Sequence, residues 1–365
     1  MSAPRTIRFG IVGTGLMAAA MAECLALEPR AQLVGVASTD VARARAFASR
    51  FAIATAHADL AALLASPDVD AVYIANATRD HARTAIAALA VGKAVLCEKP
   101  FALDLAEATQ VAEAAARHGR LFVEAQWTVH LPAFLALKRL VESNGLGAVS
   151  HVASTFGRSL DAATHRRLFE GPGAGVLLDF AVYPIVLARA LLGPVTSVRA
   201  ALAYNAARVD VQASLQLTHA GGGQSQLGAS LVAELANTSS VSGSHGLVTL
   251  VSPVMGVEAL ALRSTTPARG ADGPPAPAGA KQRLAAALRR QAWVRRLKSR
   301  LQRARVETHA WGADRYAPQL AHFIALLDAG ALQSDRMPIA VSLDVMRVIE
   351  QARADCPPPE QGPST

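Results

Sequence analysis

The chain has little cysteine, few aromatic side chains and no long uninterrupted apolar run. Its 365 residues include three cysteines, Cys24, Cys97 and Cys356, too few and too far apart for a disulfide framework or a zinc site. No run of 18 or more apolar residues is free of charge, so we expect no transmembrane helix. The first eight residues do not have the pattern of a signal sequence. We therefore expect a protein of the reducing cytoplasm, with no bound metal.

Charge is also scarce, because only 18% of the residues are charged whereas 52% are hydrophobic. Such a chain can bury a substantial core and is not globally disordered. Its net charge of +8 comes from one segment, since residues 281–305 hold ten Lys or Arg and no Asp or Glu, and the remainder carries −2. The body is thus nearly neutral, and we expect no binding to nucleic acid.

The first third of the sequence alternates short apolar runs with helical segments. The runs at 6–12, 32–37, 71–75, 93–97 and 121–125 have the character of buried strands. Strands that alternate with helices predict a parallel sheet, so we expect an α/β, Rossmann-type domain over 1–125.

After residue 125 the pattern changes to closely spaced strands. Strand-like runs occupy 195–204, 208–219, 225–235, 238–243, 247–251 and 257–263, and glycines 221–223 form a hairpin-like turn between two of them. Residues 126–365 therefore predict an α+β domain with a mostly antiparallel open sheet, which would serve substrate binding and oligomerisation.

A glycine-rich turn follows the first strand and opens a helix. It comprises Gly13, Thr14, Gly15, Leu16, Met17 and Ala18. In this context the first glycine permits the tight turn, the second lets a pyrophosphate approach the backbone, and the helix N-terminus supplies amide donors. We predict that NADP or NAD binds here.

The end of the second strand carries no acid for a ribose. Ser38 occupies the position where NAD enzymes usually place a carboxylate. Ser38, Thr39 and Arg43 could instead accept a 2′-phosphate, which slightly favours NADP, although Arg43 could equally be a solvated helix residue. Asp40 is expected to cap the following helix.

Two further strand ends carry polar residues. Ala75, Asn76 and His81 follow the third predicted strand, where His81 could face the cofactor or cap a helix. Glu98, Lys99 and Pro100 end the next one, and ligands of open α/β sheets bind beyond such carboxyl ends. A partly buried Lys99 could titrate or donate to a substrate oxygen, because burial lowers a lysine pKa. The alternative is a surface Glu–Lys pair.

Five segments together resemble the Gfo/Idh/MocA oxidoreductases, the glucose–fructose oxidoreductase and inositol dehydrogenase family. They are GTGLMA (13–18), YIANATRDH (73–81), GKAVLCEKPF (92–101), VEAQWT (123–128) and GVLLDFAVYP (175–184). The resemblance runs from Ile7 to about Arg353 and is interrupted at 264–307. The D-x-x-x-Y-P form is similar to the branch of dihydrodiol and D-xylose dehydrogenases.

The resemblance implies an NAD(P)-dependent dehydrogenase for a sugar, a polyol or a related secondary alcohol. Lys99 would hydrogen-bond the substrate hydroxyl and the nicotinamide ribose, and the Lys99–Pro100 bond would be cis. Tyr183 would be the acid/base, its pKa lowered by Lys99, and Asp179 would orient the substrate. Gln126 and Trp127 would also contact the small-molecule substrate. A homodimer or homotetramer is expected, again by resemblance.

Four residues depart from the family pattern, and a second function class stays open. Ala181 replaces the glycine of D-x-G, Val129 stands where arginine often follows W-T, and Ala77 and Thr78 replace P-N. These changes leave the substrate open. The alternative is a non-catalytic NAD(P)-binding regulator or scaffold, which would not need to keep Lys99, Asp179 and Tyr183.

The interruption at 264–307 is not explained by the family. Residues 264–280 are rich in Pro, Gly and Ala, as in a flexible linker, and 281–305 predict a basic helix that contains Trp293. This segment is either a solvated excursion from the body or a docking helix for an anionic membrane surface or an acidic partner.

Overall fold

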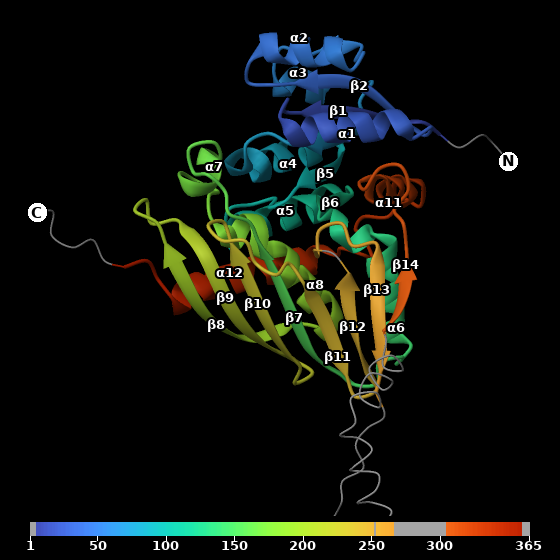
Figure 1. Ribbon diagram of the computed structural model, residues 1–365. Helices are drawn as coiled ribbons and strands as arrows, with labels where there is room; N and C mark the ends of the chain where they lie inside the picture. The colour runs from blue at the N-terminus through green and yellow to red at the C-terminus, as the bar shows by residue number, and fades with distance from the viewer. Residues whose placement is uncertain (1–4, 252, 266–303, 360–365) are drawn as a thin grey trace, which may run out of the picture.

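The structure, a computed structural model, describes residues 5–251, 253–265 and 304–359, which contain two large sheets (Figure 1). The first sheet has six strands in the order β3-β2-β1-β4-β5-β6, and all neighbours run parallel. Its strands are β1 (Ile7–Val12), β2 (Ala31–Ala37), β3 (Thr55–Ala56), β4 (Ala71–Ile74), β5 (Ala94–Glu98) and β6 (Phe122–Ala125). The predicted Rossmann-type sheet is confirmed, while β3, only two residues long, was not predicted.

Helices α1 to α5 connect these strands. They are α1 (Leu16–Leu27), α2 (Val41–Arg50), α3 (Leu60–Ala65), α4 (His81–Ala90) and α5 (Leu105–His118). An aspartate side chain caps the first turns of α2, α3 and α5, namely Asp40, Asp59 and Asp104. The predicted cap at Asp40 is thereby confirmed, since its carboxylate accepts from the amides of Ala42 and Arg43.

The second sheet has eight strands in the order β14-β13-β12-β11-β7-β10-β9-β8. They are β7 (Val149–Gly157), β8 (Val195–Tyr204), β9 (Asp210–His219), β10 (Gln224–Ser230), β11 (Ser239–Gly243), β12 (Gly246–Val251), β13 (Ala259–Ser264) and β14 (Arg305–Thr308). All neighbours are antiparallel except β7 and β10. This confirms a mostly antiparallel sheet.

Strand β14 corrects the predicted end of the basic helix. Arg305, assigned to that helix, begins a strand that pairs antiparallel with β13, and Leu262 faces Arg305 across the pair. Backbone pairing with β13 outweighs the helical pattern at this point, a long-range contact that the local sequence does not carry. The rest of the predicted helix, 281–303, lies outside the described residues.

Helices from the second half of the chain return to the first sheet. Within the described residues, the remaining elements are η1 (Thr78–Asp80), η2 (Trp127–His130), α6 (Pro132–Glu142), α7 (Arg166–Phe169), the π-helical turn η3 (Leu177–Ala181), α8 (Val182–Leu192), α11 (Ala317–Asp328) and α12 (Ile339–Asp355). Helix α11 packs against α1 and η2, and its Phe323 ring lies 6.0 Å from that of Phe9 in β1. Helix α12 packs against α5, α8 and β8. The two sheets are therefore joined by helices of the C-terminal region.

The end of α12 lies along β8, the edge strand of the second sheet. The amide of Ala200 donates to Asp355 Oδ2 (2.8 Å), and the amide of Leu202 donates to Cys356 Sγ (3.3 Å). The Tyr204 hydroxyl donates to the Cys356 carbonyl (2.6 Å). Edge amides that would otherwise stay unpaired are thus bonded within the chain.

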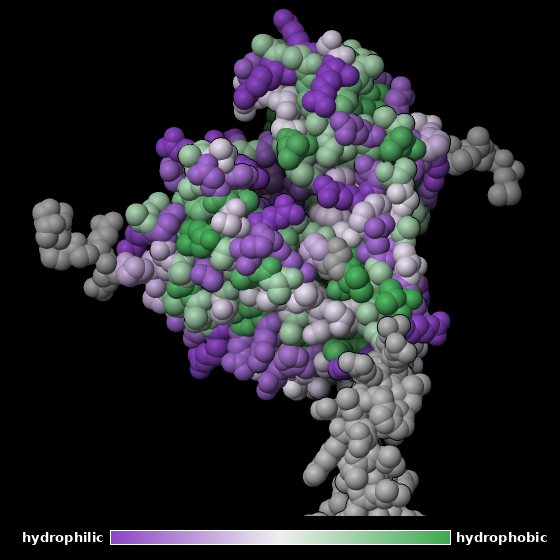
Figure 2. Space-filling view, in the orientation of Figure 1, coloured by the Kyte–Doolittle hydropathy of each residue, from purple (hydrophilic) through white to green (hydrophobic). Residues whose placement is uncertain are grey.

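Figure 2 shows the molecule hollowed between the domain of the first sheet and the domain of the second. In the part of the chain that the structure describes, no helix has the length and apolar character needed to cross a membrane.

Candidate active site

The glycine-rich turn between β1 and α1 meets the geometric needs of a dinucleotide site. Gly13 has φ +109°, and a β-carbon there would overlap the Ala75 carbonyl oxygen. Gly15, the N-cap of α1, has no other residue within 4 Å of where its β-carbon would be. Because no side chain caps α1, its first amides are available to an anion. These residues fit a bound NAD(P), which supplies hydride transfer when present.

The structure brings Thr39 and Arg43 together at the end of β2. Arg43 Nη2 donates to Thr39 Oγ1 at 3.3 Å, and its Nε lies 3.5 Å from Asp40 Oδ2. All three side chains are exposed, and Ser38 lies beside them in sequence. A guanidinium and hydroxyls therefore meet where the ribose of a dinucleotide is bound in this fold.

His81 ties two of the strand ends to each other. Its ring is buried, with Nδ1 2.8 Å from the Pro100 carbonyl oxygen and Nε2 3.2 Å from the Asn76 carbonyl oxygen. Burial lowers the pKa of this imidazole. The N-cap of α4 is Asp80, so His81 does not cap the helix. Instead it fixes the backbone of two loops that were both predicted to contact the cofactor.

Lys99 lies at the carboxyl end of β5 and reaches across to the second domain. Its Nζ donates both to the carbonyl oxygen and to Oδ1 of Asp179, each at 2.9 Å. Both side chains are largely buried, so the reading of Lys99 as a surface lysine is wrong. The Lys99–Pro100 bond is cis, as the resemblance implied.

The Asp179 carbonyl lacks one of the donors that a helix could offer it. Asp179 lies in the π-helical turn η3, and Pro184 follows five residues later. A proline has no N–H, so Pro184 cannot make the i→i+5 hydrogen bond that a π-helix would direct to this carbonyl. The Lys99 ammonium donates to it at 2.9 Å. Pro184 of the Y-P pair thus removes one competitor of the lysine for this oxygen.

Lys99 and Asp179 each shift the other's pKa in the direction that favours its charged form. Burial alone would lower the pKa of Lys99, but the neighbouring Asp179 carboxylate raises it above its ordinary value. Burial likewise acts to raise the pKa of Asp179, and Lys99 brings it below its ordinary value. The predicted lowering of the Lys99 pKa is therefore wrong, because the ion pair outweighs the cost of burial.

Tyr183 lies against the same ammonium. Lys99 Nζ is 4.9 Å from the centroid of the Tyr183 ring, and the Phe156 ring packs edge-on at 5.9 Å. Burial raises the pKa of Tyr183, while Lys99 opposes that rise without cancelling it. The predicted net lowering of the Tyr183 pKa is wrong, because burial outweighs the effect of Lys99 and the sequence does not reveal that the phenol is buried.

Glu98 bonds to groups of the first domain, including the backbone amide of Lys99, which donates to Glu98 Oε2 at 3.3 Å. Its carboxylate is buried and accepts a short hydrogen bond from the Tyr73 hydroxyl of β4. Burial raises the pKa of Glu98, and the Tyr73 hydrogen bond opposes this. Tyr73 was not among the predicted site residues, although a tyrosine within a buried strand requires a hydroxyl partner.

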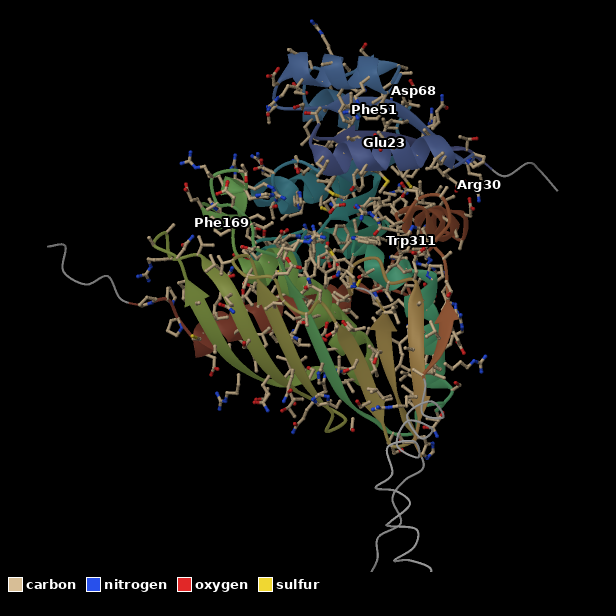
Figure 3. All side chains as sticks on the ribbon, viewed as in Figure 1. Glu23, Arg30, Phe51, Asp68, Phe169 and Trp311 are labelled. Atoms are coloured by element: carbon tan, nitrogen blue, oxygen red, sulfur yellow. The ribbon has the colours of Figure 1, made fainter. Side chains whose placement is uncertain are left out.

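Aromatic side chains from distant segments meet around Trp127, one of the predicted substrate contacts. The Trp127 ring meets Tyr316 edge-on at 5.2 Å, and the Arg315 guanidinium lies 5.3 Å from the Trp127 centroid. Trp311, labelled in Figure 3, approaches the same wall at Gly256. Gln126 is buried, and neither of its side-chain polar atoms has a partner among the described residues. Tyr316, Arg315 and Trp311 were missed, because they follow the insertion and no short motif marks them.

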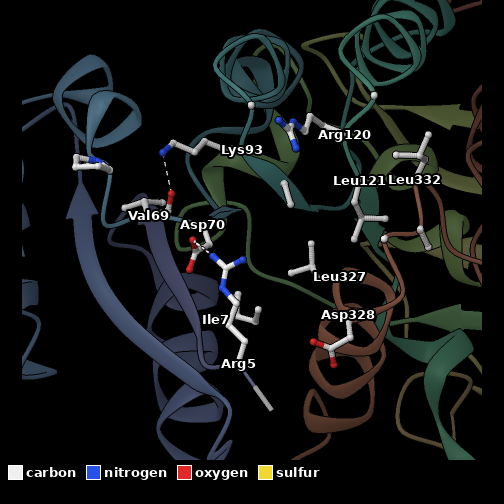
Figure 4. A pocket seen from close by; sticks show the side chains of 16 residues that line it. Arg5, Ile7, Val69, Asp70, Lys93, Arg120, Leu121, Leu327, Asp328 and Leu332 are labelled. Atoms are coloured by element: carbon white, nitrogen blue, oxygen red, sulfur yellow. Dashed lines mark hydrogen bonds and ion pairs between the residues drawn. The ribbon is translucent and has the colours of Figure 1, made fainter. Parts of the chain in front are cut away.

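Two cavities also adjoin the first domain. A cavity of about 380 Å³ adjoins Thr14, Gly15 and Leu16 on the outer side of α1. A larger one, of about 670 Å³, lies at the opposite edge of the first sheet and is lined by Lys93 and Arg120 (Figure 4). In the larger cavity Arg5 pairs with Asp70, and Lys93 donates to backbone carbonyls. That cavity is distant from the converging residues around Lys99.

Comparison with known proteins agrees with this geometry. An oxidoreductase family with an NAD-binding Rossmann fold, Gfo/Idh/MocA, matches residues 7–126, and the GFO/IDH/MocA C-terminal domain matches residues 134–249. Trans-1,2-dihydrobenzene-1,2-diol dehydrogenase of Bos taurus is 33% identical over 251 residues, covering 68% of this chain and 75% of the relative. The human enzyme of that name is 30% identical over 68% of this chain and 75% of its own length.

Solved structures share the fold over nearly the whole chain. The 3-ketoreductase KijD10 of Actinomadura kijaniata, in complex with NADP and TDP-benzene, has a TM-score of 0.76 and 24% identity, covering 96% of this chain and 98% of its own. A levoglucosan dehydrogenase, in complex with NADH and levoglucosan, has a TM-score of 0.78 and 19% identity at the same coverage. With both domains matched in order, this chain belongs to the Gfo/Idh/MocA family of NAD(P)-dependent oxidoreductases.

Proposed function

We propose that this protein transfers a hydride between NAD(P) and a CH–OH carbon of a sugar, a polyol or a cyclic diol. The observation that carries the proposal is the buried Lys99–Asp179 pair beside Tyr183, at the carboxyl end of β5. The relatives named above act on a dihydrodiol and on sugar-like molecules, which supports this class of substrate.

In this proposal each member of the trio has a distinct role. Lys99, held by Asp179, donates a hydrogen bond to the substrate oxygen and stabilises negative charge on it. Asp179 keeps the lysine protonated and in place. Tyr183 exchanges the proton of the substrate oxygen through its hydroxyl. Since burial raises the pKa of Tyr183, its phenol holds a proton at neutral pH, which suits donation to a carbonyl oxygen in the reductive direction.

The aromatic side chains around Trp127 would form one wall of the substrate site. Trp127, Tyr316 and Trp311 would cover the apolar face of a sugar or diol, as aromatic rings do for C–H groups. The buried amide of Gln126 offers a donor and an acceptor that no described residue uses. The replacements Val129 and Ala181, both buried, alter this side of the site, so substrate choice is expected to differ from that of family members with arginine and glycine there.

A direct assay tests the function. The purified protein would be incubated with NADP⁺ or NAD⁺ and a panel of trans-dihydrodiols, D-xylose and levoglucosan, and reduced cofactor would be followed by absorbance. The reverse reaction would use NADPH with the matching ketones or lactones. Turnover with one class is expected. Tight NADPH binding without turnover of any compound, in either direction, would instead support the regulatory or scaffold alternative.

We infer a modest preference for NADP over NAD from the surroundings of β2. Arg43 and Thr39 share a hydrogen bond there, and no carboxylate takes the position of Ser38. A guanidinium hydrogen bond to a phosphate is worth more than a neutral one. Arg43→Ala should weaken NADPH binding about tenfold and leave NADH binding nearly unchanged, as measured by equilibrium fluorescence titration. Tighter binding of NADH by the wild type would reverse the assignment.

The basic segment 281–303 is proposed to dock on an anionic membrane surface or an acidic partner. Its lysines and arginines would each add up to about 1 kcal/mol near such a surface, an attraction that salt screens. The segment connects β13 to β14 in the sequence, and these strands are paired neighbours in the sheet, which supports replacing the segment with a short linker. Replacing 266–303 with a short Gly-Ser linker should preserve turnover and abolish salt-sensitive binding to phosphatidylserine vesicles. No binding by the intact chain at low salt would leave the alternative of a solvated excursion.

We also propose a homodimer or homotetramer, from the family resemblance, and a cytoplasmic location, from the scarcity of cysteine. Sedimentation of the purified protein measures the first. A monomer at micromolar concentration would contradict it.

A further inference from the structure

Asp210 is a buried carboxylate outside the site described above. It is the first residue of β9, and its side chain is 4% exposed. A buried charge requires both a counter-ion and hydrogen bonds, so its partners indicate what it holds in place.

One oxygen of Asp210 bonds the start of the helix that carries the catalytic candidates. Oδ1 accepts from the amide of Leu177 at 2.9 Å, and Leu177 is the first residue of η3. Amides in the first turn of a helix lack intrahelical acceptors, and a carboxylate there also interacts favourably with the helix dipole. Asp179 lies two residues later and Tyr183 six residues later.

The other oxygen bonds the end of α12. Oδ2 accepts from Arg353 Nε at 3.2 Å and from Arg353 Nη2 at 3.0 Å. Asp210 therefore bridges β9, the start of η3 and the helix that packs on α5 of the first domain.

Gly175 makes close approach to this carboxylate possible. Its φ is +119°, and a β-carbon would lie 2.5 Å from Asp210 Oδ1. The Gly175 carbonyl in turn accepts from the amide of Asp179 at 3.2 Å. Asp210 thus borders the residue that bonds the Asp179 backbone directly.

Resting on the proposed function, we propose that Asp210, charge-balanced by Arg353, is a positioning residue for Asp179 and Tyr183. It fixes the first turn of η3 so that the Asp179 carbonyl and carboxylate both face Lys99. A shift of this turn by about 1 Å would misplace two hydrogen bonds to one ammonium, and displacements of that size can cost on the order of 100-fold in rate.

The test compares Asp210→Asn with a matched control at the same end of α12. Asp355 also joins α12 to the second sheet, through Arg199 and the amide of Ala200, but bonds nothing in η3. We expect Asp210→Asn to lower kcat about 10- to 100-fold with NADPH affinity within about twofold of wild type. Asp355→Asn should leave both unchanged. Equal kcat in Asp210→Asn and wild type would overturn the proposal.

A second pair of variants separates positioning from folding. Arg353→Lys keeps the charge and should retain most of kcat, whereas Arg353→Met should lower kcat as Asp210→Asn does. If both Arg353 variants lose kcat only in proportion to the loss of folded protein seen by circular dichroism, Asp210 has a structural role alone. Lys99→Ala, measured in parallel, tests the proposed function itself, because wild-type turnover in that variant would refute the mechanism whatever Asp210 does.

Discussion

Two lysines stand at the two ends of the same strand, β5, and their surroundings differ. Lys93, at the amino end, donates from Nζ to the carbonyl oxygens of Ser66 and Val69, each at 2.8 Å, and Figure 4 shows the bond to Val69. Lys99, at the carboxyl end, donates to a carbonyl and a carboxylate of Asp179. Burial lowers the pKa of Lys93, whereas the neighbouring carboxylate leaves the pKa of Lys99 raised despite burial.

The surroundings of the two lysines differ because the two edges of the parallel sheet contact different parts of the chain. At the amino edge Lys93 bonds carbonyls of the loop before β4, within one domain. At the carboxyl edge, the edge at which the glycine turn also follows its strand, Lys99 meets a residue of the other domain. The same residue type therefore joins loops at one end and, in the proposed mechanism, faces the substrate at the other.

The largest expected contrast is in turnover. Lys99→Ala should lower kcat by at least about 100-fold, because it removes the donor to the substrate oxygen, while cofactor affinity stays nearly intact. Lys93→Ala should leave kcat within about twofold of wild type, since its bonds lie at the far edge. Steady-state kinetics of both variants check this, and equal losses would break the comparison.

A second variant removes only the hydroxyl of Tyr183, whose ring lies beside Lys99. Tyr183→Phe keeps the ring that packs against Lys99 and Phe156 but deletes the hydroxyl. We expect kcat to fall by at least about 100-fold, the usual contribution of a positioned acid/base, with NADPH affinity unchanged. Single-turnover kinetics measure the chemical step directly. Wild-type turnover here would assign the proton transfer to another group.

A smaller effect is expected on the Lys93 side. Lys93→Met keeps much of the side-chain volume but removes two hydrogen bonds to partly buried carbonyls. The free energy of unfolding should fall by about 1–2 kcal/mol, with kcat preserved. Urea unfolding at neutral pH gives the value. An unchanged midpoint would mean that water replaces the ammonium at no cost.

The smallest expected effect concerns how the free energy of unfolding changes with pH, since the contributions of the two lysines change in opposite directions at alkaline pH. Since the Lys93 pKa is lowered in the folded state, the unfolded chain binds its proton more tightly, and stability from this residue rises with pH up to about 10.4. The Lys99 pKa is raised, so its contribution is complete below about 10.4 and is lost only above that. Between about pH 8.5 and 10, the stability difference between wild type and Lys93→Met should therefore widen, and that for Lys99→Met should stay constant. Urea unfolding at both pH values measures this.

Most of the first domain could be predicted from the sequence, because its signals are local. The glycine turn, the cap at Asp40 and the apolar strands that end in Glu98 and Lys99 each occupy a few consecutive residues. The cis bond after Lys99 followed from the family motif rather than from any local physical signal.

The remainder depends on contacts between distant segments. The direction in which the Lys99 pKa is shifted depends on Asp179, 80 residues away, so it was predicted wrongly from the sequence alone. The complete burial of Tyr183 and the aromatic wall at Tyr316 arise in the same way. Strand β14 needs β13 as its partner, and for that reason its first residue, Arg305, was predicted to be helical.

The end of α12 has a consequence for how copies of this protein can meet. An edge strand is a template for another chain, and sheets grow by adding strands to it. At β8 the backbone amides of Ala200 and Leu202 are already occupied by Asp355 and Cys356. A strand of another copy therefore cannot hydrogen-bond to these amides of β8. Copies that assemble through the eight-stranded sheet must meet through its face or its opposite edge.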